Sequence, residues 1–169
     1  MSLNTVRSFF LFIFLILLQV WVLNHVHIGG VAIPLAYIYF ILKLSSANGR
    51  SWVTFWAFML GLIIDIFNNT PGLNALAATF AGFFRYYILN LFSSKEEKDF
   101  VPSIGTMGVG AFLRYTLTII LLHHITLFCI EAFSFYAPLL LLLKIAGSSA
   151  LTFLMVFAFE FIGHDATKK

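Results

Sequence analysis

The sequence predicts an all-α integral membrane protein of about six transmembrane helices, organised as a single helical domain over residues 1–169. Hydrophobic residues make up 61% of the chain and charged residues 10%, with a mean hydropathy of +0.98. Soluble domains carry about 25% charged residues, and a chain of this size could not hide so much apolar surface from water. Long apolar stretches alternate with short polar connections, and the basic residues cluster in alternate connections.

Six apolar segments are expected, at residues 8–23, 31–44, 52–67, 73–92, 101–123 (or as far as 129) and 138–162. The first follows Arg7 as in a signal peptide, but no small-residue cleavage site comes after it, so we expect a retained helix. The first three segments would measure only about 21–25 Å against a hydrocarbon core of roughly 30 Å. Because Pro34 lies near the start of the second segment, a re-entrant second segment is the alternative.

The basic residues predict the orientation of the helices. If the N-terminus is cytoplasmic, the outer connections carry neither Lys nor Arg, which is the positive-inside pattern. An even number of crossings then places both termini in the cytoplasm. The scattered basic residues form no patch, so a nucleic-acid partner is not expected. The residues at or near the inner face would be Arg7, Lys43, Arg50, Arg85, Lys95, Lys98, Lys168 and Lys169.

Among the charged residues inside the apolar segments, three stand out: Asp65, Arg114 and Lys144. If helices begin near residues 51, 101 and 138, Asp65 and Arg114 lie about 20 Å above the inner surface and Lys144 about 9 Å below the outer one. All three would then share the outer half of the bilayer, where an isolated charge costs about 2–3 kcal/mol or more. We expect Asp65 to pair with Arg114 or Lys144. The alternative is that each side chain extends separately to the outer interface.

Small residues indicate where helices approach one another closely. Ala75, Ala78 and Gly82 share one face of the fourth segment, and Gly105 and Gly108 lie near the start of the fifth. Small side chains allow close backbone approach in a bilayer. Either group could receive the helix of a partner, or both could be used within the protein.

Little in the sequence indicates catalysis, and no cofactor is expected. His25 and His27 belong to one outer connection, and His123 and His124 lie near the outer end of the fifth segment. The two pairs could meet and bind a metal at the outer face, although polar residues at the membrane interface would give the same pattern. No nucleophile motif and no glycine-rich phosphate loop is present in the sequence.

The most distinctive stretch covers residues 58–82, FMLGLIIDIFNNTPGLNALAATFAG. An apolar helix carries a glycine one turn before an aspartate, and a short Asn/Thr/Pro/Gly turn leads into a helix of small residues. This stretch resembles the signature region of the rod shape-determining protein MreD family, although the turn is one residue shorter than in the family pattern. The residues at matching positions are Gly61, Asp65, Pro71, Gly72, Leu73, Ala75 and Ala77.

The resemblance implies a fold and a function. MreD-like proteins lie in the bacterial cell inner membrane, in the machinery of cell elongation, and their bundle is similar to the substrate-binding subunits of energy-coupling-factor vitamin transporters. They bind a single-pass MreC-like protein and are associated with MreB-like filaments and enzymes of peptidoglycan synthesis. No catalytic activity is attributed to them. The resemblance therefore predicts a non-enzymatic scaffold that controls cell shape.

Two other functions remain open from the residues themselves. A vitamin-binding transporter subunit would need a polar pocket near one face, which Asp65, Arg114, Lys144 and the outer connections could line. A small membrane enzyme would need paired catalytic groups. Outside the loop at residues 93–99 and the C-terminal tail, the acidic residues are Asp65, Glu131 and Glu160, and no two of them share a segment.

Overall fold

A computed structural model describes residues 3–29, 32–93, 99–133 and 137–166, the side chains of 3–5 and 164–166 excepted. The described chain is helical and contains five helices that are long and apolar enough to cross a membrane. Apolar helices of about 20 residues match the thickness of a bilayer, so the chain is a helical, multi-pass membrane protein. These five are α1 (Leu3–Trp21), α3 (Arg50–Asn68), α4 (Leu73–Phe92), α6 (Val109–Ala132) and α7 (Pro138–Ala166).

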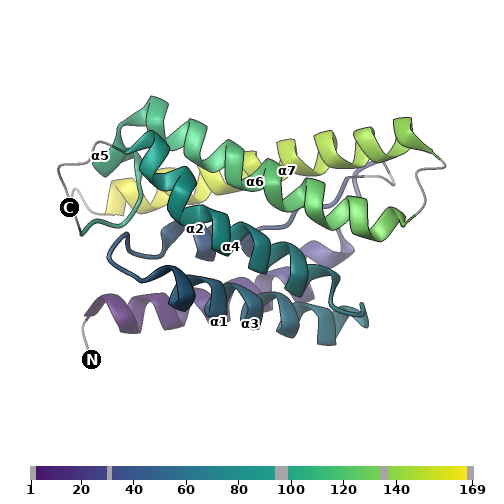
Figure 1. Cartoon of the computed structure of the whole chain (residues 1–169), viewed down its shortest axis with the longest axis horizontal. Coiled ribbons are helices and arrows are strands. Elements are labelled where there is room, and N and C mark those ends of the chain that lie inside the picture. Colours follow the sequence, from purple (N-terminus) through teal and green to yellow (C-terminus); the bar gives the residue numbers. More distant parts are fainter. Residues whose placement is uncertain (1–2, 30–31, 94–98, 134–136, 167–169) are drawn as a thin grey trace.

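The long helices lie roughly alongside one another in a bundle (Figure 1). One end of the bundle contains the starts of α1 and α3 and the ends of α4 and α7. We call this the first end and the opposite one the second end. The short 3₁₀-helix η1 (Leu23–His25) and the turn between α3 and α4 lie at the second end.

The second apolar segment, expected as a helix over residues 31–44, is helical only in α2 (Ile38–Lys43). Pro34 explains the difference, because proline lacks an N–H and disfavours helical backbone in the residue before it. The segment still runs from the second end toward the first (Figure 1). Its side chains from Leu35 to Leu42 are buried among the long helices.

The non-helical part of this segment obtains its hydrogen bonds from other helices. Ile33 donates its N–H to the Ser148 hydroxyl at 3.0 Å, and Leu35 donates to the Thr152 hydroxyl at 2.9 Å. The Gln19 side chain donates to the Pro34 carbonyl at 3.1 Å. Irregular backbone at membrane depth is tolerated where the protein satisfies its polar groups, as it does here.

The fifth apolar segment is interrupted at Gly108, whose φ of +77° favours glycine. The short helix α5 (Ile104–Met107) precedes this break, and α6 begins only at Val109. Arg114 therefore lies about 8 Å from the start of its helix, near the first end, and not at the same height as Asp65, as the sequence suggested. The sequence placed Arg114 and Asp65 at a similar height because the hydropathy pattern did not reveal where the break falls.

The first end also carries Lys43, at the end of α2, and Arg50, at the start of α3. Arg85 in α4 is buried and donates to the Leu44 carbonyl, just beyond the end of α2. The four other lysines expected at the inner face lie outside the described residues. These are Lys95, Lys98, Lys168 and Lys169.

Candidate functional site

Asp65 holds the start of α4 against the end of α3. Its side chain is buried, at 3% exposure. Oδ1 accepts the backbone N–H and the side-chain amide of Asn74 at 3.0 and 2.9 Å, and Oδ2 accepts the Ala75 N–H at 2.8 Å. The Thr70 hydroxyl also donates to Oδ1.

These backbone donors are the second and third N–H groups of α4, which have no partner within their own helix. Gly72, at the N-cap, has no side chain that could accept them. Asp65, which belongs to the preceding helix α3, therefore caps the N-terminus of α4. The negative charge also interacts favourably with the positive end of the α4 dipole. The buried carboxylate is thus stabilised without a basic partner among the residues that the structure describes.

Gly61 makes this capping geometry possible. A Cβ on Gly61 would lie 2.4 Å from the Asn74 carbonyl oxygen and 2.6 Å from the Ala75 Cα. The missing side chain therefore lets the first turn of α4 rest directly on α3. Gly72 adopts a φ of +80° in the turn that leads into α4. The remaining signature residues lie around this junction, with Pro71 exposed, Leu73 packed against the core, and Ala75 and Ala77 buried.

A chain of hydrogen bonds leads from Asp65 into the bundle. The Tyr37 hydroxyl donates to Asn74 Oδ1 at 3.0 Å, while the Asn74 amide donates to Asp65. His123 Nε2 lies 2.8 Å from the same hydroxyl. Because the Tyr37 proton is used on Asn74, Nε2 of a neutral His123 must carry the proton and donate to Tyr37. All three hydrogen bonds therefore point toward the carboxylate, an order in which each bond polarises the next.

The neighbouring His124 uses the opposite tautomer. Its Nδ1 lies 2.8 Å from the Ile120 carbonyl oxygen, which can only accept, so Nδ1 carries the proton. Its Nε2 then accepts from the Thr152 hydroxyl at 3.2 Å, and Thr152 in turn accepts the Leu35 N–H. Both histidine side chains are fully buried. Their role in this geometry is to join α6 to the second segment and α7.

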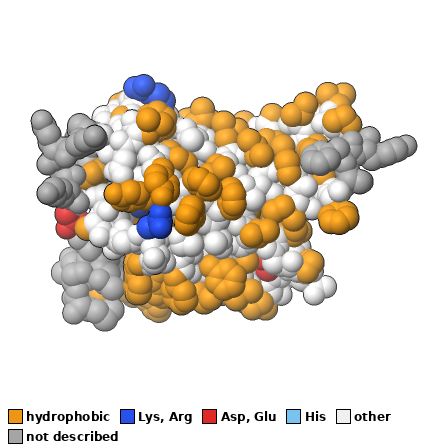
Figure 2. All heavy atoms as spheres, in the orientation of Figure 1, with side chains coloured by type: hydrophobic (Ala, Val, Ile, Leu, Met, Phe, Trp, Pro, Cys, Tyr) orange, Lys and Arg blue, Asp and Glu red, His pale blue; other side chains and the backbone are white. Residues whose placement is uncertain are grey.

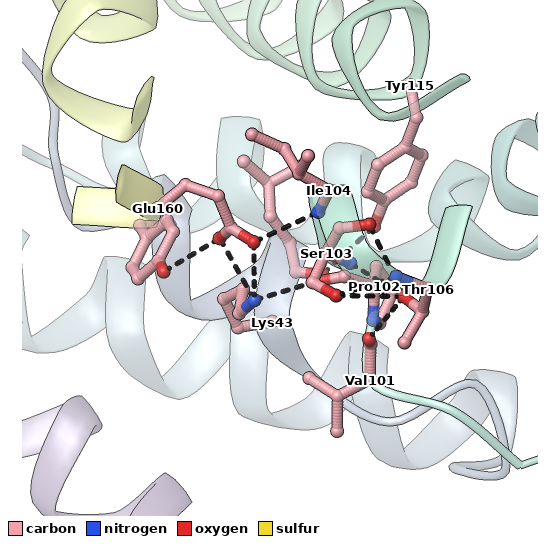
Figure 3. A network of polar contacts seen from close by, with 10 residues as sticks. Lys43, Val101, Pro102, Ser103, Ile104, Thr106, Tyr115 and Glu160 are labelled. Atoms are coloured by element: carbon pink, nitrogen blue, oxygen red, sulfur yellow. Dashed lines mark hydrogen bonds and ion pairs between the residues drawn. The ribbon is translucent and has the colours of Figure 1, made fainter. Parts of the chain in front are cut away.

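A second buried carboxylate, that of Glu160 in α7, binds groups from several elements at the first end (Figure 3). Its side chain accepts from Lys43 Nζ at 3.0 Å, from the Tyr39 hydroxyl at 3.2 Å and from the Ile104 N–H at 3.1 Å. Lys43 also donates to the Pro102 carbonyl at 2.8 Å. Glu160 thereby connects α7 to the second segment and to the start of α5.

The expected pairing of Asp65 with Arg114 or Lys144 is not found in the described structure. Asp65 is satisfied by the start of α4, as described above. Arg114 donates Nε to the Gly110 carbonyl at 3.0 Å and lies over the Phe92 ring. Lys144 instead forms an ion pair with Glu131 at 3.3 Å. Both partners of that pair are partly exposed, and such pairs contribute about 0–1 kcal/mol.

The two groups of small residues differ in their surroundings. Ala75, Ala78 and Gly82 are buried, and a Cβ on Gly82 would lie 2.7 Å from the Ala57 Cβ of α3. That face is used within the protein and is not free to receive a partner helix. Gly105 and Gly108, by contrast, are exposed beside the start of α6.

The two pairs of histidines, which could have met to bind a metal, lie in different surroundings. His25 and His27 are exposed near η1, whereas His123 and His124 are enclosed in the bundle. No group of three or more metal-ligating side chains gathers within the described residues. In comparisons with known protein families, curated proteins and solved structures, no match was found for this chain.

Sequence reasoning did not identify Tyr37 and Asn74, and it named Lys43 and Glu160 without predicting that they pair. Tyr37, Asn74, Lys43 and Glu160 stand among apolar neighbours, where a polar side chain needs a partner. That signal marks each residue as important. It does not say which distant residue it contacts, because the contacts depend on how the helices pack.

Proposed function

We propose that the chain crosses the bacterial cell inner membrane six times, with both termini in the cytoplasm. The five membrane-length helices and the second segment, which runs between the same two ends, support six crossings. Lys43 and Arg50 lie at the first end, which would be the cytoplasmic one under the positive-inside rule. Asp65 and the α3–α4 turn would then lie near the outer face.

Within that membrane, we propose that the protein is a non-enzymatic scaffold of the cell-wall elongation machinery, similar to the MreD family. The observation that supports this most is the use of Asp65, the most distinctive residue of the signature stretch. Its carboxylate is occupied by four hydrogen bonds that fix the α3–α4 hairpin. A carboxylate so occupied is suited to hold a shape and not to exchange protons with a substrate.

The proposed partner is an MreC-like single-pass protein, with MreB-like filaments and enzymes of peptidoglycan synthesis in the same assembly. Its helix would dock at the start of α6, where Gly105 and Gly108 are exposed and Val109 is 54% exposed. Small residues favour close helix contacts in a bilayer, where apolar burial alone gives no driving force.

Affinity purification of the mildly solubilised protein, followed by mass spectrometry, tests the proposed assembly. Recovery of an MreC-like protein with enzymes of wall synthesis is expected. Recovery of transporter ATPase subunits, with thermal stabilisation by a vitamin, would replace the scaffold with the vitamin-binding alternative.

Cysteine crosslinking tests the proposed docking face. Gly105→Cys should capture the partner helix, because Gly105 is exposed and has room for a side chain, whereas the buried Ala78→Cys should not. Equal capture by both, or capture by neither, would contradict docking at the start of α6.

A further inference from the structure

An exposed groove lies along α3 and α4, near the first end of the bundle. The groove has a volume of about 430 Å³, and Arg50, Thr54, Phe58, Thr79 and Phe83 contribute to its lining. Figure 2 shows this face of the molecule, where a basic side chain is set among hydrophobic ones over α3 and α4. Ligand pockets usually measure about 300–1,000 Å³, so the groove is large enough for part of a small amphipathic molecule.

Most of the groove presents apolar surface. The hydroxyl of Thr54 donates to the Arg50 carbonyl at 2.9 Å, and that of Thr79 donates to the Ala75 carbonyl at 2.6 Å. Both hydroxyl protons are therefore used within their own helices, as is usual for threonine in membrane helices. Phe58 and Phe83 are 39% exposed each and contribute aromatic surface to the groove.

The groove ends at a positive charge. Arg50 is the first residue of α3, and its guanidinium lies 4.8 Å from the Phe83 ring centroid and 5.8 Å from that of Tyr87. Its Nη1 also donates to the Tyr87 hydroxyl. No carboxylate among the described residues pairs with Arg50. The guanidinium is thus held in place by aromatic contacts while keeping donors for an anion.

We propose that this groove binds an anionic phospholipid, with its phosphate on Arg50 and one acyl chain along Thr54, Phe58 and Thr79. Arg50 stands at the end of a membrane-length helix, and Phe58 lies about 12 Å farther along it, toward the bilayer centre. This order of charge and apolar surface matches that of a phospholipid, whose phosphate lies at the interface and whose chain points inward. Basic residues at the cytoplasmic interface recognise anionic lipid headgroups in this way.

A partner helix fits the groove less well. Close helix contacts need small residues, and the small residues of this hairpin, Gly61 and Gly82, are turned toward the opposite helix of the pair. The groove instead presents phenylalanine rings and a charge. The inference does not rest on the scaffold function, because it requires only that the start of α3 meets the membrane interface.

Native mass spectrometry of the protein in a neutral detergent tests the proposal. Phosphatidylglycerol and phosphatidylcholine of the same chain length are added in parallel, and bound lipid is counted. We expect a preference for phosphatidylglycerol that Arg50→Gln lowers by about fivefold, the contribution of one basic residue at an anionic surface. Thr79→Phe, which fills the groove, should lower the binding of both lipids.

Arg114→Gln is the matched control, because Arg114 is also exposed near the first end but lies outside the groove. It should leave the lipid preference unchanged, and all three variants should keep the wild-type melting temperature in neutral lipid. The proposal is overturned if Arg50→Gln keeps the preference, if Arg114→Gln lowers it equally, or if a cysteine at Thr79 crosslinks to a protein helix in membranes.

Discussion

The two ends of the bundle each bury a carboxylate, but they stabilise it by different means. Asp65 is 3% exposed and accepts hydrogen bonds from neutral donors, two of them backbone N–H groups at the start of α4. Glu160 is 4% exposed and is paired with a cation, Lys43, at 3.0 Å. A helix N-terminus can therefore replace a basic side chain as the partner of an acid inside a membrane protein.

The two interactions also differ in the sequence separation of their partners. Asp65 and its donors lie within ten residues of one another, so the interaction joins two consecutive helices. Glu160 and Lys43 are separated by 117 residues, and their contact joins the second segment to α7. The first carboxylate therefore stabilises a hairpin, whereas the second stabilises the closure of the whole bundle.

The largest loss of stability is expected from Asp65→Leu. The substitution would leave two buried backbone N–H groups without acceptors, at about 1–3 kcal/mol each, for a total of about 2–6 kcal/mol. Unfolding of the solubilised protein by a denaturing detergent measures the change. Asp99→Leu, at an exposed carboxylate, is the control. Equal losses for the two variants would show that Asp65 is not a helix cap.

The next largest loss is expected from Lys43→Met, which removes the cation but leaves Glu160 buried. Breaking a buried pair from one side costs about 3 kcal/mol or more. Adding Glu160→Gln should restore part of this loss, because the uncompensated charge is then removed. A double-mutant cycle of unfolding free energies gives the coupling. Strictly additive losses would mean that the pair does not act as a unit.

A smaller loss is expected from Gly61→Ala, which tests the geometry that brings Asp65 to α4. The added Cβ would meet backbone atoms of Asn74 and Ala75, so the two helices must separate, at about 1–3 kcal/mol. Gly49→Ala is the control, since a Cβ there meets nothing within 4 Å. If Gly61→Ala is as stable as Gly49→Ala, close contact between α3 and α4 is not needed for the cap.

The smallest loss is expected from Tyr37→Phe, which interrupts the chain of hydrogen bonds behind Asp65. It removes the donor to Asn74 and the acceptor for His123, at about 1–2 kcal/mol. Tyr86→Phe, at an exposed tyrosine, should have no effect on the unfolding free energy. A coupling near zero between Tyr37→Phe and Asp65→Asn would show that the chain of hydrogen bonds does not support the cap.

The sequence predicted the Asp65 end better than the Glu160 end, because local and distant contacts leave different signals. The aspartate, the turn and the small residues of the α3–α4 hairpin are adjacent in the chain, and four of the six expected segments are long helices close to their predicted bounds. The expected ion pair of Asp65 is not found among the described residues, because hydropathy does not show which side chains meet. Pro34 and Gly108 changed the second and fifth segments through backbone geometry, which an apolar window does not detect.

The hydroxyl groups of α7 that accept the N–H groups of Ile33 and Leu35 also constrain the order of assembly. These contacts join positions 115 and 117 residues apart. During synthesis the second segment enters the bilayer long before Ser148 and Thr152 have been translated. Until then its non-helical backbone has no acceptors from α7, and hydrocarbon offers none. The contacts between the second segment and the last helix can therefore form only after α7 has been translated, and a chain truncated before α7 would lack the acceptors for these two N–H groups.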